Sequence, residues 1–460
     1  MIYDVVILGG GPGGYVAGIR AAQYGLSVAI IEKDKVGGTC LNRGCIPTKA
    51  MLSSAELIHK MRHKEEFAIV SENDMDIKID MVKLIERKNR IVDELVGGIE
   101  KLCKGRKIEI FSSHGVLESK NSVKLSDGSL VEGKNIILAT GSEPLNLPFL
   151  NIDGKNVITS NEALNLESLP KNILVIGGGV VGVEFASMFK DFGSSVTIVE
   201  MMKYLVPVED NQVSRTLQTS FKKRGISLKL KTKVEKVDIV KDGEVEVSFS
   251  DGTKEVYDKV LAALGRSVNT KDLGYIENGV ELDERGFVKI DDAMKTSVDN
   301  IYAIGDITGK MLLAHTASTQ GLAAIGDIVG KPVKVDYDSI PSAVFTTPEI
   351  SSVGKRENEL KADKVPYKVS RFSFAAIGKA KAMGEEEGFV KLLTDPEGEK
   401  ILGAHIIGAH ASDLLSEYTL VKNSNLAIDV ITNTVHSHPT LSEAVHEATE
   451  GIHKMSIHSM

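Results

Sequence analysis

The sequence lacks the features that would point to a membrane or nucleic-acid partner. It has no apolar run that approaches the roughly 18 residues of a membrane-spanning helix. It has no excess of positive charge, because 55 lysines and arginines stand against 63 aspartates and glutamates, which gives a net charge of -8. A nucleic acid or an anionic membrane would favour a basic surface, so neither is expected as the main partner.

Cysteine is also scarce, with 3 residues in a chain of 460. So few cysteines are typical of a reducing compartment, where a disulfide is more often catalytic than structural. The chain passes from Met1 directly into the apolar run IYDVVILG, without the basic segment and cleavage site of a signal peptide. Long flexible linkers and low-complexity segments do not occur in the sequence either. We therefore expect a soluble, cytoplasmic protein whose domains pack tightly.

An internal repeat is the strongest organisational feature that the sequence does contain. The segment DVVILGGGPGGYVAGIRAAQYGLSVAIIEKDK near the N-terminus is matched by NILVIGGGVVGVEFASMFKDFGSSVTIVEMMK, which begins at Asn172. Each copy has an apolar run, a GxGxxG loop, a helix-period stretch and a second apolar run that ends in a glutamate. In both copies 23 positions separate the first glycine from that glutamate. The repeated positions are Gly9, Gly11, Gly14 and Glu32 in the first copy and Gly177, Gly179, Gly182 and Glu200 in the second.

This pattern predicts two dinucleotide sites. The first glycine permits a tight turn, the second lets the backbone approach a pyrophosphate, and the third lets helix and strand pack closely. The helix N-terminus offers unpaired N–H groups to the phosphates, and the glutamate accepts hydrogen bonds from a ribose diol. In the second copy Glu200 favours NAD over NADP, because a carboxylate repels a 2′-phosphate. Met201 and Met202 supply no arginine for that phosphate, and Lys203 is the nearest cation.

Two cysteines five positions apart, Cys40 and Cys45, follow the first glycine loop in GGTCLNRGCIPTK. On a regular helix their side chains would diverge by about 140° and their Cα atoms would lie about 8 to 9 Å apart, which is too far for a disulfide. The segment is therefore expected to be irregular, with Gly44 supplying the bend and Pro47 early in the next helix. The alternative is two unconnected free thiols, which is the expectation for Cys103.

A histidine and a glutamate near the end of the chain, His438 and Glu443 in HPTLSE, complete the candidate chemistry. With the cysteines and the glycine loops they indicate a flavin-linked dithiol/disulfide redox centre, in which the histidine acts as a base. A zinc site made of Cys40, Cys45, His436 and His438 is conceivable. The four-residue gap between the cysteines and the lack of a second cysteine pair fit zinc patterns poorly, so no metal is expected. His436 alone is expected to be a packed or surface histidine.

The remaining segments indicate the order of elements. A pair of long helices is expected over roughly residues 44–63 and 80–104. Short runs with turn signals, SDGS after the first loop and SDGT after the second, predict β-rich stretches. Pro341 and Pro348 open a C-terminal segment of mixed strands and helices.

Taken together, these motifs resemble the class I pyridine nucleotide-disulfide oxidoreductases, and the dihydrolipoyl dehydrogenases among them most of all. The resemblance covers essentially the whole chain. Besides GGTCLNRGCIPTK and HPTLSEA, the matching segments are ILATGS at 137–142, AALGR at 262–266, NIYAIGD at 300–306, MLLAH at 311–315 and FTTPEISSVG at 345–354.

The resemblance implies an α/β fold with two Rossmann-like dinucleotide-binding domains, for FAD and NAD, and a C-terminal α+β dimerisation domain. The implied boundaries are 1–144 for the FAD-binding domain with the redox disulfide, 145–270 for the NAD-binding domain, 271–338 for a central domain that completes the FAD site, and 339–460 for the dimerisation domain.

The resemblance also implies the residues that contact the cofactors. For FAD these are Gly9, Gly11, Gly14, Glu32, Thr39, Lys49, Gly115, Asp306 and Ala314, and for NAD they are Gly177, Gly179, Gly182, Glu200, Val234 and Gly265. Lys49 is expected to lie against the flavin ring and to pair with Glu184, although without the family both residues are expected to be exposed surface charges. Arg43 stands where many relatives have an apolar residue. It either lowers the pKa of a neighbouring thiol or points into solvent, and we expect the second.

The implied activity is the oxidation of protein-bound dihydrolipoamide to lipoamide through a Cys40–Cys45 disulfide and FAD, with reduction of NAD to NADH. His438 of a homodimer partner is expected to act as the base and Glu443 to orient it. The implied partner is a lipoylated carrier protein or acyltransferase of a 2-oxoacid dehydrogenase, acetoin dehydrogenase or glycine cleavage system. The alternatives are a flavin disulfide reductase for another disulfide, and a non-catalytic flavoprotein scaffold subunit.

Overall fold

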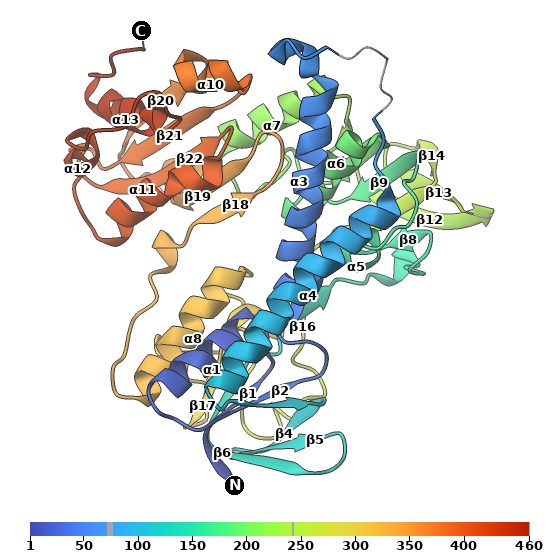
Figure 1. The fold of residues 1–460 in the computed structure, drawn as a ribbon, viewed down its shortest axis with the longest axis vertical. Coiled ribbons are helices and arrows are strands. Elements are labelled where there is room, and N and C mark those ends of the chain that lie inside the picture. Colours follow the sequence, from blue (N-terminus) through green and yellow to red (C-terminus); the bar gives the residue numbers. More distant parts are fainter. Residues whose placement is uncertain (71–76, 242, 460) are drawn as a thin grey trace. The chain divides into compact units, whose positions relative to one another are not determined.

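The computed structural model describes residues 1–70, 77–241 and 243–459 and divides the chain into two compact units. Each unit is discontinuous in sequence (Figure 1). Unit 1 comprises Met1–Ala50, Val82–Asn146 and Arg266–Val335. Unit 2 comprises Met51–Met81, Leu147–Gly265 and Asp336–Met460.

Unit 1 is built on a seven-stranded sheet in the order β3-β2-β1-β6-β5-β4, with β17 also paired to β6. The pairs among β1, β2, β3, β6 and β17 are parallel, whereas β5 runs antiparallel to both β4 and β6. β1 is almost entirely apolar because parallel strands are buried on both faces, and its Ile7 is aligned with Ile30 and Ile137 of its neighbours. The strands are β1 (Ile2–Leu8), β2 (Val28–Glu32), β3 (Glu109–Ser112), β4 (Gly115–Ser119), β5 (Ser122–Leu125), β6 (Leu130–Leu138) and β17 (Ile301–Ala303), with β7 (Ser142–Pro144) and β16 (Arg266–Val268) forming a separate antiparallel pair.

The helices of unit 1 include the predicted long pair. The expected helices over 44–63 and 80–104 are confirmed as α3 (Cys45–Arg62), which continues into unit 2, and α4 (Met81–Gly105). The others are α1 (Pro12–Gln23), α2 (Gly38–Arg43), α8 (Ala314–Ile328) and the 3-10 turn η3 (Gly305–Thr308).

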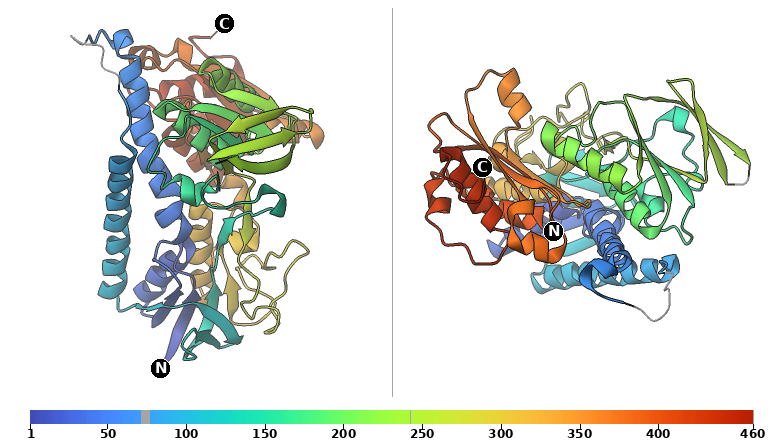
Figure 2. Two further views of the ribbon diagram at one scale, coloured as in Figure 1. Left: turned by 90° about the vertical axis from the view of Figure 1, so that its right-hand side faces the viewer. Right: turned by 90° about the horizontal axis from the view of Figure 1, so that it is seen from above.

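Helices α1 and α8 approach each other closely, and Figures 1 and 2 show them side by side. A Cβ atom on Gly321 of α8 would lie 2.7 Å from the Gly13 carbonyl oxygen of α1. Glycine at this position therefore allows α1 and α8, which are distant in the sequence, to pack closely against each other.

Unit 2 contains the second copy of the repeat, folded as a five-stranded parallel sheet in the order β11-β10-β9-β15-β8. A three-stranded antiparallel sheet, β12-β13-β14, shares a hydrophobic core with it that includes Leu174, Val247 and Val260. The turns SDGS and SDGT connect β5 to β6 and β13 to β14, as predicted. The elements are η1 (Lys64–Phe67), η2 (Pro148–Leu150), β8 (Val157–Ile158), α5 (Ser160–Ala163), β9 (Asn172–Ile176), α6 (Val180–Phe192), β10 (Ser195–Glu200), α7 (Asn211–Lys223), β11 (Ser227–Leu230), β12 (Val234–Lys241), β13 (Glu244–Phe249), β14 (Lys254–Tyr257) and β15 (Lys259–Ala262).

The C-terminal part of unit 2 is an antiparallel sheet in the order β18-β19-β22-β21-β20. Helices α11 and α13 pack on this sheet in one core, where Tyr418 donates a hydrogen bond to the Val445 carbonyl at 2.9 Å. The expected α/β class with a C-terminal α+β segment is confirmed. The elements are η4 (Tyr337–Ser339), β18 (Ser342–Val344), β19 (Ile350–Gly354), α9 (Glu357–Ala362), β20 (Lys368–Ser373), η5 (Phe374–Ala376), α10 (Gly378–Met383), β21 (Phe389–Thr394), β22 (Ile401–Ile407), α11 (Ala411–Asn423), α12 (Asp429–Thr432), α13 (Glu443–Glu450) and η6 (Gly451–His453).

A buried ionic cluster joins the two sheet systems of unit 2. Lys391 of β21 is fully buried, and its ammonium lies 2.9 Å from the nearer Asp210 carboxylate oxygen and 2.7 Å from a Glu357 oxygen. Asp210 is also the N-cap of α7, where it accepts the Gln212 N–H. Burial would raise the pKa of Glu357, but hydrogen bonds from Lys361, Lys391 and a tyrosine lower it to about 2. The Glu357 carboxylate is therefore ionised at neutral pH.

We expect Lys391→Met to destabilise the protein by roughly 3–5 kcal/mol, because it leaves the buried Asp210 carboxylate without its lysine. Thermal and urea unfolding of the full chain followed by circular dichroism measure the effect. The control is Lys254→Met, which removes a surface lysine that lies 2.8 Å from Glu246. This change should lower the free energy of unfolding by about 1 kcal/mol or less. An equal decrease in the free energy of unfolding for the two variants would contradict a structural role for the buried cluster.

Candidate functional site

The cysteine segment adopts the irregular path that the spacing predicts. Helix α2 ends at Gly44, whose φ of -138° and ψ of -111° leave the helical region, and α3 begins at Cys45. A Cβ on Gly44 would lie 2.9 Å from the Thr39 carbonyl oxygen, so the tight break favours glycine. Cys40 and Cys45 are both half-buried thiols, and a hydrogen bond joins their side chains.

The surroundings of Cys40 shift the pKa of its thiol. The pKa of the Cys40 thiol is raised, first by its hydrogen bond with Cys45 and then by burial, while the Lys49 ammonium acts in the opposite direction.

The other expectations for this segment are confirmed. Arg43 forms a 2.6 Å ion pair with Asp34, and both side chains are exposed, so it points to the surface. Cys103 is fully buried on α4, and burial raises the pKa of its thiol. It behaves as a packed apolar side chain and not as a redox group.

The first glycine loop has the form that a dinucleotide phosphate requires. Cβ atoms on Gly9 and Gly14 would lie 2.2 Å from the Ala139 carbonyl oxygen and 1.9 Å from the Gly9 carbonyl oxygen, so the backbone itself occupies that space. At Gly11, the N-cap of α1, the nearest atom would be 3.9 Å away. The Glu32 carboxylate, at the end of β2, accepts the Gly10 N–H at 2.8 Å. The N–H groups at the start of α1, which follows Gly11, are therefore placed where a dinucleotide phosphate would bind.

The second loop repeats this arrangement. Cβ atoms on Gly177 and Gly182 would collide with backbone carbonyls, whereas a Cβ on Gly179 would meet no atom within 4 Å. The Glu200 carboxylate accepts N–H groups of Gly178 and Met202, each at 2.7 Å. Both loops therefore fit a bound dinucleotide, and each glutamate is fixed beside its loop in the position expected for a ribose contact.

The remaining residues expected around FAD lie in three parts of unit 1. Thr39 is in α2 and Lys49 is in α3, while Gly115 begins β4 and Ala314 begins α8. The Asp306 carboxylate accepts a hydrogen bond from the Ser142 hydroxyl. In unit 2, Val234 begins β12 and Gly265 follows β15 with a φ of +115°.

Arg266 is a residue of this region that the sequence reasoning missed. Its guanidinium donates to the Ser142 hydroxyl and to the Ser142 carbonyl, each at 2.6 Å, and lies 3.8 Å from Asp306. Burial lowers the pKa of Arg266, while the charges of Asp306 and Cys45 raise it. Arg266 therefore fixes the expected FAD contact Asp306 and adds positive charge near Cys45. Its place in AALGR, directly after Gly265, was the available signal.

Glu184 is not the exposed surface charge that its sequence alone suggests. It is 4% exposed on α6, and its carboxylate accepts the Phe345 N–H at 2.9 Å. This N–H belongs to FTTPEISSVG, one of the segments that carries the resemblance. Lys49 is half-buried in unit 1.

His438 and Glu443 meet as the sequence predicts. The Nδ1 atom of His438 lies 2.8 Å from Glu443 Oε1, and Glu443 Oε2 accepts the Thr440 N–H at 2.9 Å. Burial would raise the pKa of Glu443, but hydrogen bonds from His438 and Thr440 lower it. The ionised carboxylate therefore holds Nδ1–H and leaves Nε2 as the basic nitrogen, on a ring that is 78% exposed.

A cavity of about 350 Å³ lies beside this pair. Its lining includes Ile377 and Val435, together with His436, His438 and His446. His436 contributes only a buried face, because its ring packs against His446 at 5.1 Å and its Nε2 lies 3.1 Å from Glu417. The expectation that His436 is a packed or surface histidine is confirmed, and the structure shows the packed form.

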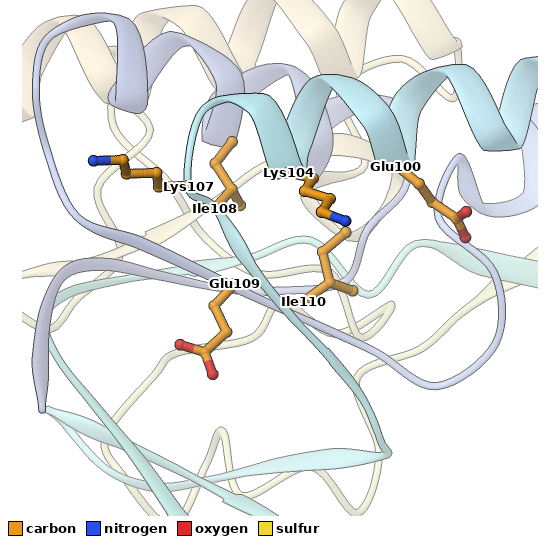
Figure 3. Close-up of a pocket in the computed structure, with 6 residues that line it drawn as sticks. All are labelled: Glu100, Lys104, Lys107, Ile108, Glu109 and Ile110. Atoms are coloured by element: carbon orange, nitrogen blue, oxygen red, sulfur yellow. The ribbon is translucent and has the colours of Figure 1, made fainter.

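Other features of the described chain are separate from this site. Among the residues with assigned positions, no group of three or more His, Cys, Asp and Glu side chains is arranged to hold a metal. Within the same residues, no helix combines the length and apolarity of a membrane span. A second hollow of about 440 Å³, shown in Figure 3, contains none of the predicted site residues, and its lining is Glu100, Lys104, Lys107, Ile108, Glu109 and Ile110.

Comparison with known proteins identifies the family. Residues 3–321 match the family described as pyridine nucleotide-disulphide oxidoreductase, and residues 340–449 match its dimerisation domain. The dihydrolipoyl dehydrogenase of Chlamydia trachomatis is 42% identical over 96% of this chain and 95% of its own. The dihydrolipoyl dehydrogenase of Bacillus subtilis is 40% identical over 99% of both chains.

Solved structures agree with these sequence relationships. LpdA from Mycobacterium tuberculosis superposes with a TM-score of 0.91 at 26% identity, over 97% of this chain and 99% of its own. The HOCl-induced flavoprotein disulfide reductase RclA from Escherichia coli gives a TM-score of 0.87 at 28% identity, over 97% of this chain and 99% of its own. The chain therefore belongs to the pyridine nucleotide-disulphide oxidoreductase family and is a flavoprotein oxidoreductase that uses FAD and NAD.

Proposed function

We propose that this protein is a dihydrolipoyl dehydrogenase, which oxidises protein-bound dihydrolipoamide to lipoamide and reduces NAD to NADH. The observation that carries the proposal is the hydrogen-bonded Cys40–Cys45 pair, because a dithiol substrate needs two neighbouring sulfurs that can form and break a bond. The full-length relatives at 40–42% identity bear the name of this activity.

The reaction first requires that a substrate thiol lose its proton and become a thiolate. An unperturbed thiol is mostly protonated at neutral pH, and only the thiolate attacks a disulfide. His438 Nε2 would take the substrate proton, while Glu443 holds Nδ1–H and stabilises the imidazolium. In the proposed homodimer His438 serves the cysteine pair of the partner chain.

The cysteines then act in sequence. The substrate thiolate attacks Cys40, and Cys45 leaves with the electron pair of the disulfide bond. The second substrate thiolate closes the lipoamide ring and releases Cys40. FAD, when bound, would supply the redox group that links the cysteine dithiol to NAD. The charge of Arg266 near Cys45 supports the thiolate state that this transfer requires.

The cofactor contacts expected from the sequence form part of the proposal. Lys49 would lie against the flavin ring and pair with Glu184, and Glu200 would receive the NAD ribose. The catalytic set is Cys40, Cys45, His438 and Glu443. The FAD set is Gly9, Gly11, Gly14, Glu32, Thr39, Lys49, Gly115, Asp306 and Ala314, and the NAD set is Gly177, Gly179, Gly182, Glu200, Val234 and Gly265.

The finer organisation is also proposed. The dimerisation domain over residues 340–449 supports a homodimer. We place the protein in the cytoplasm, with a lipoylated carrier protein or acyltransferase of a multienzyme complex as its partner. The division into segments 1–144, 145–270, 271–338 and 339–460 stays a prediction. A reductase for another disulfide is the alternative function, and the resemblance to the disulfide reductase RclA is the observation that favours it.

A substrate panel tests the function directly. We expect the FAD-loaded protein to reduce NAD with free dihydrolipoamide and with lipoylated carrier proteins, and to turn over glutathione disulfide poorly. Stopped-flow and steady-state absorbance measure the rates. Faster turnover of glutathione disulfide than of dihydrolipoamide would refute the proposal, and no turnover of either would favour a scaffold.

We expect NAD to be preferred over NADP, and Glu200→Gln to narrow the difference. Removing one charge near a 2′-phosphate is worth on the order of 1–4 kcal/mol, which corresponds to a change of roughly fivefold to several hundred-fold in the ratio of kcat/KM values. The control is Glu32→Gln in the first loop, which should leave the NAD to NADP ratio unchanged in molecules that retain FAD. Equal efficiency with both cofactors in the unmodified protein would contradict this role of Glu200.

We expect His438→Gln to slow dihydrolipoamide oxidation by at least about 100-fold without loss of FAD, because general-base assistance contributes roughly 10² to 10⁴ in rate. Glu443→Gln should slow the oxidation less than His438→Gln does. It leaves the base in place and removes only the carboxylate that orients His438 and stabilises its positive charge. Stopped-flow reduction of the FAD-loaded protein measures both rates. If Glu443→Gln were slower than His438→Gln, these roles would be wrong.

Mixed dimers give the matched control for that experiment. Cys40→Ser and His438→Gln chains are each expected to be inactive as homodimers. Heterodimers of the two should recover one intact site if the histidine serves the partner chain. Verified subunit exchange without recovered activity would refute the shared site while leaving the redox chemistry in place.

A further inference from the structure

Helix α13 presents a second glutamate–histidine pair beside the predicted base. Glu443 and Glu447 are four residues apart on this helix, so they lie on one face. Glu443 Oε1 lies 2.8 Å from His438 Nδ1, and Glu447 Oε1 lies 2.6 Å from His458 Nδ1. Two glutamates of α13 therefore hold two imidazoles in the same manner, each through the Nδ1 atom of the histidine.

Glu447 fixes the backbone of the C-terminal tail, residues 451–459, as well as the His458 imidazole. Its Oε2 atom accepts hydrogen bonds from the Ser456 hydroxyl at 2.6 Å, the Ile457 N–H at 2.9 Å and the His458 N–H at 3.3 Å. The glutamate is 7% exposed. Burial would raise the pKa of Glu447, but hydrogen bonds from Ser456 and His458 lower it, so the Glu447 carboxylate is ionised at neutral pH.

The two imidazoles line the same cavity of about 350 Å³. Both rings are accessible, with side-chain exposures of 78% for His438 and 69% for His458. Since a carboxylate occupies each Nδ1, Nε2 is the nitrogen that each ring can offer to a ligand. The charge of His458 also contributes to the lowered pKa of Glu443. The titratable groups around His458 are Glu443 and Glu447 of α13, His446 of the same helix, and His436 and His438 of the preceding loop.

We propose that His458 is a second proton acceptor of the dithiol site. This inference rests on the proposed function, because dihydrolipoamide must lose two thiol protons to become a cyclic disulfide, whereas His438 Nε2 can hold one. A second imidazole in the same cavity, fixed by its own carboxylate, meets this requirement.

The proposed oxidation of dihydrolipoamide with two imidazole bases conserves protons and electrons. His438 takes the first thiol proton, and the substrate thiolate attacks Cys40, so the Cys40–Cys45 bond breaks with its electron pair on Cys45. His458 takes the second thiol proton, and that sulfur attacks the substrate sulfur bound to Cys40. The bond to Cys40 breaks with its electron pair on Cys40, and the cyclic disulfide leaves. Two protons then rest on the imidazoles and two electrons in the cysteine pair.

The test is the pH dependence of kcat/KM for free dihydrolipoamide in the dimeric, FAD-loaded enzyme. With two bases that must both be unprotonated, log kcat/KM falls on the acid side with a slope of two. We expect His458→Asn to lower kcat/KM by about tenfold or more and to reduce the slope to one. Glu447→Gln, which releases the tail, should act in the same direction.

The matched control is His453→Asn, which changes an exposed histidine of the same tail that does not line the cavity. It should leave both rate and slope unchanged. FAD content and sedimentation confirm that each variant is a loaded dimer. If the unmodified enzyme oxidises dihydrolipoamide and His458→Asn changes neither rate nor slope, the assignment of His458 is wrong and the proposed function stands. A slower variant with an unchanged slope also overturns it. If the unmodified enzyme does not oxidise dihydrolipoamide at all, both fail.

Discussion

The contact between the Cys40 and Cys45 thiols depends on a five-residue step that a regular helix cannot make. Gly44 provides that step by separating α2 from α3. The start of the same segment is fixed by a second close approach, because a Cβ on Gly38 would lie 2.6 Å from the Gly11 Cα of the first nucleotide loop. Gly38 therefore holds the start of the cysteine segment against the first nucleotide loop, while Gly44 brings the two cysteines together within that segment.

Carboxylates that accept backbone N–H groups recur throughout the protein. Glu32 and Glu200 bond back to the loops that they follow, Glu443 to the loop before α13, and Glu447 to the tail after it. In each case a negative side chain positions a segment and remains available for a second partner. The same device therefore prepares both the nucleotide loops and the histidine pairs.

Much of this arrangement is visible in the sequence, because it depends on local spacing. The repeated glycine loops, the bend at Gly44 and the five-residue step from His438 to Glu443 are each readable from neighbours along the chain. The rest depends on contacts between distant segments. Lys391 stands in the apolar strand FVKLLT, and its partner Asp210 lies 181 residues away in the sequence. Arg266 and His458 likewise acquire their surroundings only when the chain folds.

The burial of Lys391 has a further consequence for ionic strength. Surface pairs such as Lys254–Glu246 are exposed to dissolved ions and weaken as salt is added. Lys391 and Asp210 have side-chain exposures of 0% and 1%, so mobile ions cannot reach them. Within unit 2, the connection between α7 and the C-terminal sheet is therefore insensitive to salt, and concentrated electrolyte should loosen the strand edges before it separates these two parts.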